Sequence, residues 1–135
     1  MIVSKSKKFV YVKPGKTAGT SIELALSPMC KEGDLITVLR ANDEKLRPGC
    51  AATLASPTFQ HKITGEKIHI KNHSSYSSAL KIWGAEILDY KVVISERNPW
   101  EKAISSFYWK GKGKTDMSDK NRFNRFVNNN RSPNN

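Results

Sequence analysis

The chain has 135 residues, the size of one domain, and a formal net charge of +11 from 23 Lys and Arg against 12 Asp and Glu. Hydrophobic residues make up 38% of the sequence, which allows one modest core and excludes collagen-like, coiled-coil and fully disordered classes. The longest apolar stretches fall far short of the ~20 residues of a membrane span, and the N-terminal lysines precede no apolar segment of a secretory signal. We therefore expect a cytoplasmic protein without a membrane span.

The first predicted unit is a strand, a loop and a helix. Residues 9–12 are a short β-rich run, which predicts a strand. A glycine-bearing loop over 13–21 follows, in which Thr20 or Ser21 can cap the next element. Apolar residues at helical spacing then predict a helix over 22–26.

The middle of the chain has weaker patterns. Residues 35–39 are compatible with a strand, and the proline-bearing stretch 47–58 is typical of a loop. A short strand is predicted over 67–70, with Ile68 and Ile70 on one face and His69 on the other. A helix is predicted over 74–83, behind a serine-rich start suited to capping.

A second strand, turn and helix come next. Residues 90–95 contain the continuous β-branched run Val92 to Ile94, typical of a strand buried on both faces. A helix is predicted over 100–109, with Trp100 and Phe107 on one face, and Pro99 suits its first turn.

The C-terminal part has a basic loop, a short helix and a polar tail. The loop covers 110–114, and the helix covers 122–127 with Phe123, Phe126 and Val127 inward. We expect one domain over 1–127 and a disordered tail over 128–135.

Two strand–turn–helix units separated by mixed structure indicate an α/β domain with a central parallel sheet flanked by helices. In such sheets ligands bind beyond the carboxyl ends of the strands. The turns over 13–21 and 95–99 would then share the ligand-binding edge.

The segment from Lys13 to Ser21 has the composition of a phosphate-binding loop. Its glycines let backbone N–H groups approach an anion, the helix that follows adds its positive dipole, and Lys16 adds a point charge. The nucleoside-triphosphate pattern GxxxxGK[ST] is only half met, because Val10 stands where its first glycine would be. A lysine-rich turn without chemistry is the alternative interpretation.

Arg97 and Ser105 form a second candidate pair. Arg97 ends the predicted strand and can offer a bidentate fork, while Ser105 lies two helical turns on and can offer a hydroxyl to the same phosphate. The alternative is a structural ion pair of Arg97, with Glu96 as its partner.

Together these segments resemble the sulfotransferase superfamily. Lys16 to Ser21, KTAGTS, resembles the motif that binds the 5′-phosphosulfate of 3′-phosphoadenosine 5′-phosphosulfate, and Arg97-Asn-Pro-Trp with Ser105 resembles the 3′-phosphate motif. Three intervening runs are similar to a bacterial, carbohydrate-type group: 26–37, 42–47 and 72–73. The resemblance spans roughly residues 8–127. Family domains continue past the position where this chain stops, so the resemblance implies a C-terminally truncated domain.

The resemblance implies a P-loop-like fold and a set of nucleotide-binding residues. Those expected at the 5′-phosphosulfate are Gly15, Lys16, Thr17, Ala18, Gly19, Thr20 and Ser21, with Lys16 also catalytic. Arg97 and Ser105 are expected at the 3′-phosphate. One departure is Gly15, which separates Pro14 from the motif lysine, where family members usually have proline directly before it.

His73 is the expected catalytic base. It follows a predicted strand, precedes a predicted helix and stands where the resemblance places a base. Sulfuryl transfer to a hydroxyl needs a base that works near neutral pH, and histidine suits this role. Carboxylates are the alternatives: Glu23, Glu96 and Glu101. We expect structural roles for His61 and His69.

Four aromatic residues could stack on adenine: Trp100, Phe107, Tyr108 and Trp109. For Trp100 and Phe107 the helical spacing favours a place in the core. The two cysteines, Cys30 and Cys50, form no CxxC pair, so we expect small, buried, reduced side chains, with a disulfide or a catalytic thiol as the alternative.

The resulting hypothesis is a sulfotransferase that moves a sulfuryl group from 3′-phosphoadenosine 5′-phosphosulfate to an acceptor hydroxyl, with a carbohydrate as the candidate acceptor and no metal. A kinase-like nucleotide-binding protein is the first alternative. The second is a basic nucleic-acid-binding module, supported by the net charge. Because no nucleic-acid-binding motif is recognised, the hypothesis includes no nucleic-acid partner.

Overall fold

A computed structural model describes residues 1–61, 64–110 and 120–129 of the chain. They belong to two compact units, Met1–Glu96 and Arg97–Asn135, each of which is described by itself. Within these described ranges, no helix has both the length and the apolar character needed to cross a bilayer.

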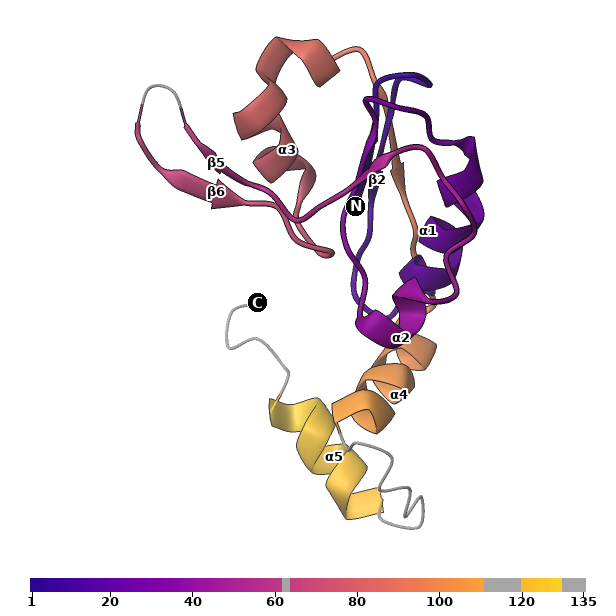
Figure 1. The fold of residues 1–135 in the computed structure, drawn as a ribbon. Helices are drawn as coiled ribbons and strands as arrows, with labels where there is room; N and C mark the ends of the chain where they lie inside the picture. The colour runs from indigo at the N-terminus through magenta and orange to yellow at the C-terminus, as the bar shows by residue number, and fades with distance from the viewer. Residues whose placement is uncertain (62–63, 111–119, 130–135) are drawn as a thin grey trace. The chain divides into compact units, whose positions relative to one another are not determined.

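The first unit contains a five-stranded sheet in the order β4-β3-β1-β2-β7 (Figure 1). Strands β2 and β7 are parallel, as are β3 and β4, whereas β1 is antiparallel to both β2 and β3. The α/β class is therefore confirmed, but the sheet is mixed rather than parallel throughout. The strands are β1 (Ile2–Ser4), β2 (Phe9–Val12), β3 (Leu35–Ile36), β4 (Thr53–Leu54) and β7 (Lys91–Ile94).

The central strand β1 has no counterpart among the predicted elements. It contains two β-branched apolar residues next to a lysine-rich turn, too short a run to show alternation. Pairing on both sides buries it. Asp34 fixes the turn, because its carboxylate accepts hydrogen bonds from the Ser4 and Ser6 hydroxyls at 2.9 and 2.7 Å and from two backbone N–H groups.

The predicted helices of the first unit are present with shifted ends. The first, α1 (Gly19–Leu26), begins three residues earlier than expected, and α3 (Tyr76–Trp83) begins after Ser75, whose hydroxyl caps it. A short helix, α2 (Ala41–Glu44), and two 3-10 turns, Ser27–Met29 and Gly84–Ile87, complete the helical part.

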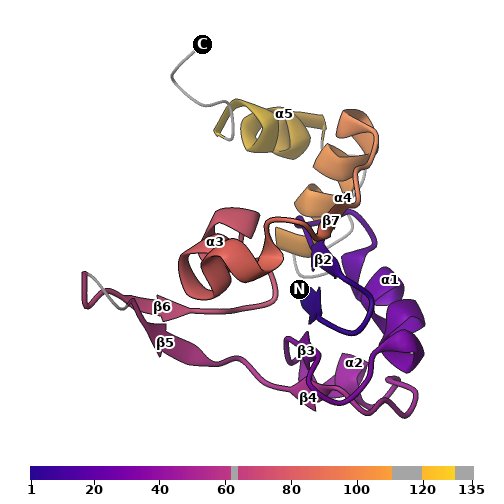
Figure 2. The same ribbon diagram turned by 90° about the horizontal axis from the view of Figure 1, so that it is seen from above.

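A separate hairpin forms from β5 (Thr58–Gln60) and β6 (Lys67–His69). Strand β6 falls within the predicted 67–70, whereas 47–58, expected to be a loop, contains β4 and the first residue of β5. Figure 2 shows the hairpin extending away from the five-stranded sheet.

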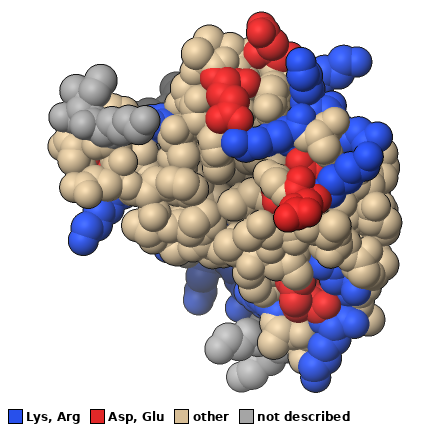
Figure 3. All heavy atoms as spheres, turned by 45° about the horizontal axis from the view of Figure 1, so that its top comes forward, with Lys and Arg blue, Asp and Glu red and all other residues tan. Residues whose placement is uncertain are grey.

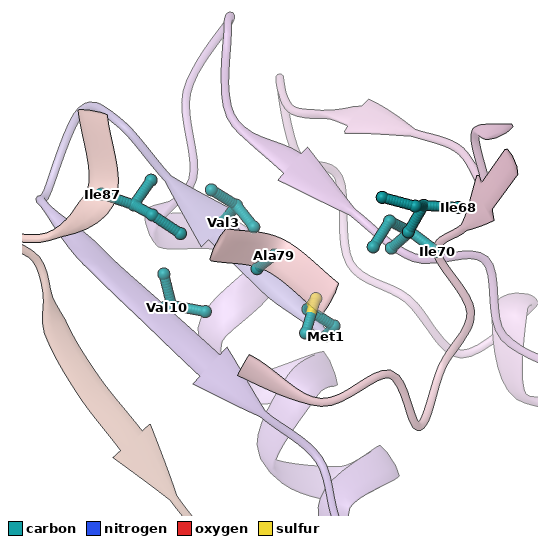
Figure 4. Packing of buried hydrophobic residues seen from close by; sticks show 7 residues of the cluster. All are labelled: Met1, Val3, Val10, Ile68, Ile70, Ala79 and Ile87. Atoms are coloured by element: carbon teal, nitrogen blue, oxygen red, sulfur yellow. The ribbon is translucent and has the colours of Figure 1, made fainter. Parts of the chain in front are cut away.

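Two apolar clusters pack on opposite faces of the sheet, because successive residues of a strand point to opposite sides. Figure 4 shows the first, in which Ile68 and Ile70 point toward the part of α3 that carries Ala79. Burial of both isoleucines and exposure of His69 confirm the predicted alternation. The first cluster comprises Met1, Val3, Val10, Ile68, Ile70, Ala79 and Ile87.

The second cluster lies between the sheet and α1. It contains Ile2, Tyr11, Cys30, Ile36 and Ala52, with Cys50 packed at its margin. Both thiols are free. Cys30 is buried as expected, and desolvation raises the pKa of its thiol to about 11; Cys50 is only half-buried.

The expectation of a doubly buried strand over 90–95 is wrong. Val92, Val93 and Ile94 are 42%, 44% and 58% exposed, and β7 is an edge strand that pairs with β2 alone in the described part of the chain. A β-branched run thus predicted the strand correctly but not its place in the sheet.

In its described part, the second unit contains α4 (Pro99–Lys110) and α5 (Lys120–Asn129). The Phe107 ring of α4 packs edge-on against Phe123 and Phe126 of α5, at centroid distances of 5.2 and 5.5 Å. Phe107 is therefore a packing residue, as expected. Trp100 is not, because it is 78% exposed. Helix α5 reaches two residues into the expected tail, and 111–114 and 130–135 lie outside the described residues.

Candidate active site

The loop between β2 and α1 has an unusual backbone. Lys16 and Ala18 have φ angles of 64° and 58°, in the left-handed region that L-residues other than Asn and Asp rarely adopt. Alternation of such residues turns successive N–H groups toward one side, as in anion-binding nests. Strain of this kind is held where the surrounding structure requires it, often at functional sites.

The start of α1 adds further N–H groups. Ala18 is the N-cap residue, and its methyl group cannot cap the helix. The expectation that Thr20 or Ser21 caps it is wrong, because both lie inside the first turn. The motif residues range from buried to exposed: Thr17 and Gly19 are buried, Lys16 and Thr20 half-buried, and Gly15, Ala18 and Ser21 exposed.

The two lysines of the loop have different environments. The side chain of Lys13 is 4% exposed, and its Nζ lies 3.3 Å from the Glu23 carboxylate of α1. Its aliphatic stem crosses Gly19, where a Cβ would overlap Lys13 Cγ. Lys13 therefore holds the loop to the helix, whereas Lys16 is the lysine that the sequence motif predicts at an anion.

Gly19→Ala is expected to destabilise the fold, because the added methyl group meets a buried and ion-paired side chain. Overpacking of this kind costs about 1–3 kcal/mol, measurable in the free energy of unfolding by urea. Gly15→Ala is the matched control, since no atom lies within 4 Å of a Cβ there. Equal effects of the two substitutions would show that the contact with Lys13 is not the cause.

Glu23 is the centre of a buried ionic cluster. Its Oε2 accepts from the Met1 amino group at 3.2 Å and from Lys13, while Oε1 accepts from Arg47 at 3.3 Å. The carboxylate is fully buried. Burial lowers the pKa of the Met1 amino group from 8.0 to about 6, against the opposing effect of Glu23. With both oxygens engaged by cations, Glu23 is a counter-ion in this structure.

We expect Glu23→Gln to cost about 3–5 kcal/mol of folding free energy, the scale of removing one partner of a buried ion pair. Urea unfolding monitored by circular dichroism measures the loss. Glu86→Gln is the control, because its pair with Lys5 is about half exposed and should contribute at most about 1 kcal/mol. Similar small losses in both variants would contradict the role assigned to Glu23.

A chain of hydroxyl groups joins the loop to the end of β7. The Thr17 hydroxyl donates to the Pro14 carbonyl at 3.0 Å and is hydrogen-bonded to the Ser95 hydroxyl at 2.9 Å, which in turn bonds Tyr11 Oη at 3.0 Å. The parallel register of β2 and β7 brings these groups together, since it aligns Val12 with Ile94. The Thr17 hydroxyl therefore fixes the loop.

His73 lies at the beginning of the same loop. Its Nδ1 is 2.8 Å from the Lys13 carbonyl oxygen. Because a carbonyl can only accept, Nδ1 carries the hydrogen, and Nε2 is the nitrogen that can take up a proton. The ring is exposed.

The backbone next to His73 is also held. The Asn72 carbonyl accepts from the Met1 amino group at 3.2 Å, and the Asn72 side-chain oxygen accepts from the Thr37 hydroxyl at 3.0 Å. Four supporting residues were not expected from the sequence: Asn72, Thr37, Ser95 and Arg47. For Ser95 a signal exists in the sequence, since it ends the strand expected beside the loop.

Arg97 and Ser105 belong to the second unit. Arg97 precedes α4 and forms an exposed ion pair with Glu101, with Nε to Oε2 at 3.1 Å. The expected partner, Glu96, is therefore wrong, and the i,i+4 spacing across the start of the helix explains the choice. Ser105 is half-buried in the same helix. Exposed pairs of this kind are weak, so the guanidinium can exchange Glu101 for a phosphate.

The other two histidines bond within the β5–β6 hairpin. His69 Nδ1 lies 2.7 Å from the Thr58 hydroxyl, and His61 Nδ1 accepts from the Thr64 N–H at 3.2 Å. In the described ranges, no three His, Cys, Asp or Glu side chains gather as a metal site would require.

No protein-family model, curated protein or solved structure matches this chain.

Proposed function

We propose that the chain is a sulfotransferase that binds 3′-phosphoadenosine 5′-phosphosulfate at residues 15–21 and transfers its sulfuryl group to an acceptor hydroxyl. The observation that carries the proposal is the hydrogen bond between His73 Nδ1 and the Lys13 carbonyl. It places an imidazole with an available Nε2 at the start of a strained, cationic loop. A base beside an anion-binding loop is the combination that sulfuryl transfer to a hydroxyl needs.

A P-loop-like fold is part of the proposal. The loop over 13–18 joins a strand to a helix at the carboxyl end of β2, and β7 runs parallel beside it. Anions bind at such edges of α/β sheets. These features support the fold assignment made from the resemblance to the sulfotransferase superfamily.

The reaction would proceed by in-line displacement at sulfur. The acceptor oxygen forms a bond to sulfur as its proton passes to His73 Nε2, and the bond from sulfur to the bridging phosphate oxygen breaks. The electron pair of that bond stays on 3′-phosphoadenosine 5′-phosphate. Lys16 and the N–H groups of the loop stabilise the charge that grows on the bridging oxygen. The resemblance makes a carbohydrate hydroxyl the candidate acceptor.

A transfer assay tests the proposal. The chain is incubated with the donor and a panel of hydroxyl-bearing saccharides, and release of 3′-phosphoadenosine 5′-phosphate is followed. We expect release that depends on the acceptor and is insensitive to chelators. Magnesium-dependent consumption of ATP, without release from the sulfate donor, would instead identify a kinase-like protein.

If Arg97 and Ser105 bind the 3′-phosphate, alanine at either position should remove the preference for 3′-phosphoadenosine 5′-phosphate over adenosine 5′-phosphate. A hydrogen bond to a charged group contributes about 1.5–3 kcal/mol, so calorimetry can resolve the Arg97→Ala effect. Glu101→Ala is the matched control, because it breaks the ion pair with Arg97 but keeps the guanidinium. An unchanged preference with a lowered melting temperature would make Arg97 a structural residue.

A further inference from the structure

Strand β6 and the residues after it carry a regular row of basic side chains. Lys67, His69 and Lys71 are exposed, whereas Ile68 and Ile70 between them are buried in the first apolar cluster. Side chains on one face of a strand are roughly 7 Å apart. The spacing between these basic side chains therefore matches the spacing between alternate side chains of an extended peptide.

The backbone of the same residues faces an open edge. In antiparallel pairs, alternate residues exchange hydrogen bonds with the partner strand. The Ile70 N–H donates to the Pro57 carbonyl at 3.0 Å, so the N–H and C=O groups of Lys67 and His69 point away from β5. No strand in the described part of the chain pairs with this edge of β6.

The face of the hairpin that carries Lys67 and His69 has no acidic side chain among the described residues of β5 and β6. Gln60 and Thr58 of β5 stand opposite Lys67 and His69. The nearest carboxylate along the chain, Glu66, is 3.2 Å from Lys81 of α3. In Figure 2, α3 lies on one side of the hairpin only, and the buried Ile68 and Ile70 face it.

We propose that the free edge of β6 binds an extended acidic peptide by strand addition. Its backbone would bond the outward N–H and C=O groups of Lys67 and His69, and carboxylates at alternate positions would face Lys67, His69 and Lys71. Main-chain bonds supply affinity in this mode and alternate side chains supply specificity. The inference goes beyond the proposed sulfuryl transfer and does not depend on it.

Other basic parts of the described surface are less suited to binding an extended acidic peptide than the free edge of β6. Figure 3 shows Lys and Arg side chains on the face it draws, with Asp and Glu side chains among them. The β1–β2 turn carries Lys5, Lys7 and Lys8, but Lys5 is paired with Glu86, and a turn offers no strand edge. The β6 edge combines charge with an unpaired backbone.

Fluorescence anisotropy with a labelled octapeptide of alternating Glu and Thr tests the proposal. We expect saturable binding that falls about tenfold or more in Lys67→Glu/Lys71→Glu. The control, Lys7→Glu/Lys31→Glu, makes the same change in net charge at exposed positions elsewhere and should bind as the parent does. Circular dichroism shows whether each variant keeps its fold.

Two further probes separate strand addition from charge attraction. A peptide of the same composition with its glutamates in one block, and the alternating peptide methylated at the glutamate nitrogens, should both bind at least about tenfold more weakly. Equal binding of the methylated peptide, or equal losses in the two double variants, would overturn the proposal. So would tighter binding of a single-stranded octanucleotide that Lys67→Glu/Lys71→Glu abolishes, which would assign the edge to nucleic acid.

Discussion

Replacing His73 with alanine is expected to slow sulfuryl transfer by ~10²–10⁴-fold, the contribution of a positioned general base. The acceptor hydroxyl is a poor nucleophile while it keeps its proton, and His73 Nε2 is the atom placed to take it. Fold and nucleotide affinity should remain, because the ring is exposed and its bond to the Lys13 carbonyl is only partly buried. Initial rates with saturating donor, with calorimetry alongside, measure both quantities.

Two controls sharpen this prediction. His73→Gln can still donate to the Lys13 carbonyl but is not a base, so it should be as slow as the alanine variant. His61→Ala removes a half-buried imidazole that bonds Thr64 in the hairpin and should leave transfer unchanged. A His73→Gln variant with near-normal turnover would mean that the ring only positions the loop.

Lys16→Ala is expected to lower turnover by ~10²-fold or more, the scale of losing one donor to the charge of a transition state. Binding of 3′-phosphoadenosine 5′-phosphate should weaken less than turnover, because the charge on the bridging oxygen grows as the bond breaks. Alanine is no better suited than lysine to the left-handed backbone at φ 64°, so the substitution does not relieve backbone strain. Rates and affinities from the same preparations provide the test.

Lys7→Ala is the matched control for Lys16, since it removes an exposed lysine from the β1–β2 turn. Lys7→Ala should leave turnover and the affinity for 3′-phosphoadenosine 5′-phosphate nearly unchanged. If Lys16→Ala lost affinity and turnover to the same extent, Lys16 would contribute ground-state binding alone.

The strand–loop–helix at the candidate site could be predicted from local sequence. The turn at Pro14-Gly15 and the apolar spacing from Ile22 are short-range signals, and the structure has β2, a loop and α1 in that order. The positive φ angles of Lys16 and Ala18 could not be predicted, because neither residue type favours them. They follow from tertiary constraints, which include the ties of Lys13 to Glu23 and of Thr17 to Ser95.

The missed strand β1 and the wrong burial predicted for Val93 and Trp100 depend on tertiary structure rather than on local sequence. Strand β1 is a strand because it lies between β2 and β3, and a window of three residues carries no such information. The exposure of Val93 likewise depends on how many strands stand beside β7. Helical spacing predicted Trp100 in the core, whereas its exposure is a matter of tertiary packing.

Isothermal titration of the intact chain with 3′-phosphoadenosine 5′-phosphate, ATP with Mg²⁺, and a short DNA duplex tests the central claim most directly. Each competing function predicts a different ligand as the tightest. We expect 3′-phosphoadenosine 5′-phosphate to bind most tightly, without need of Mg²⁺, and Lys16→Ala to weaken it. Tighter binding of ATP with Mg²⁺ or of the duplex, unaffected by Lys16→Ala, would contradict a sulfotransferase site in this loop.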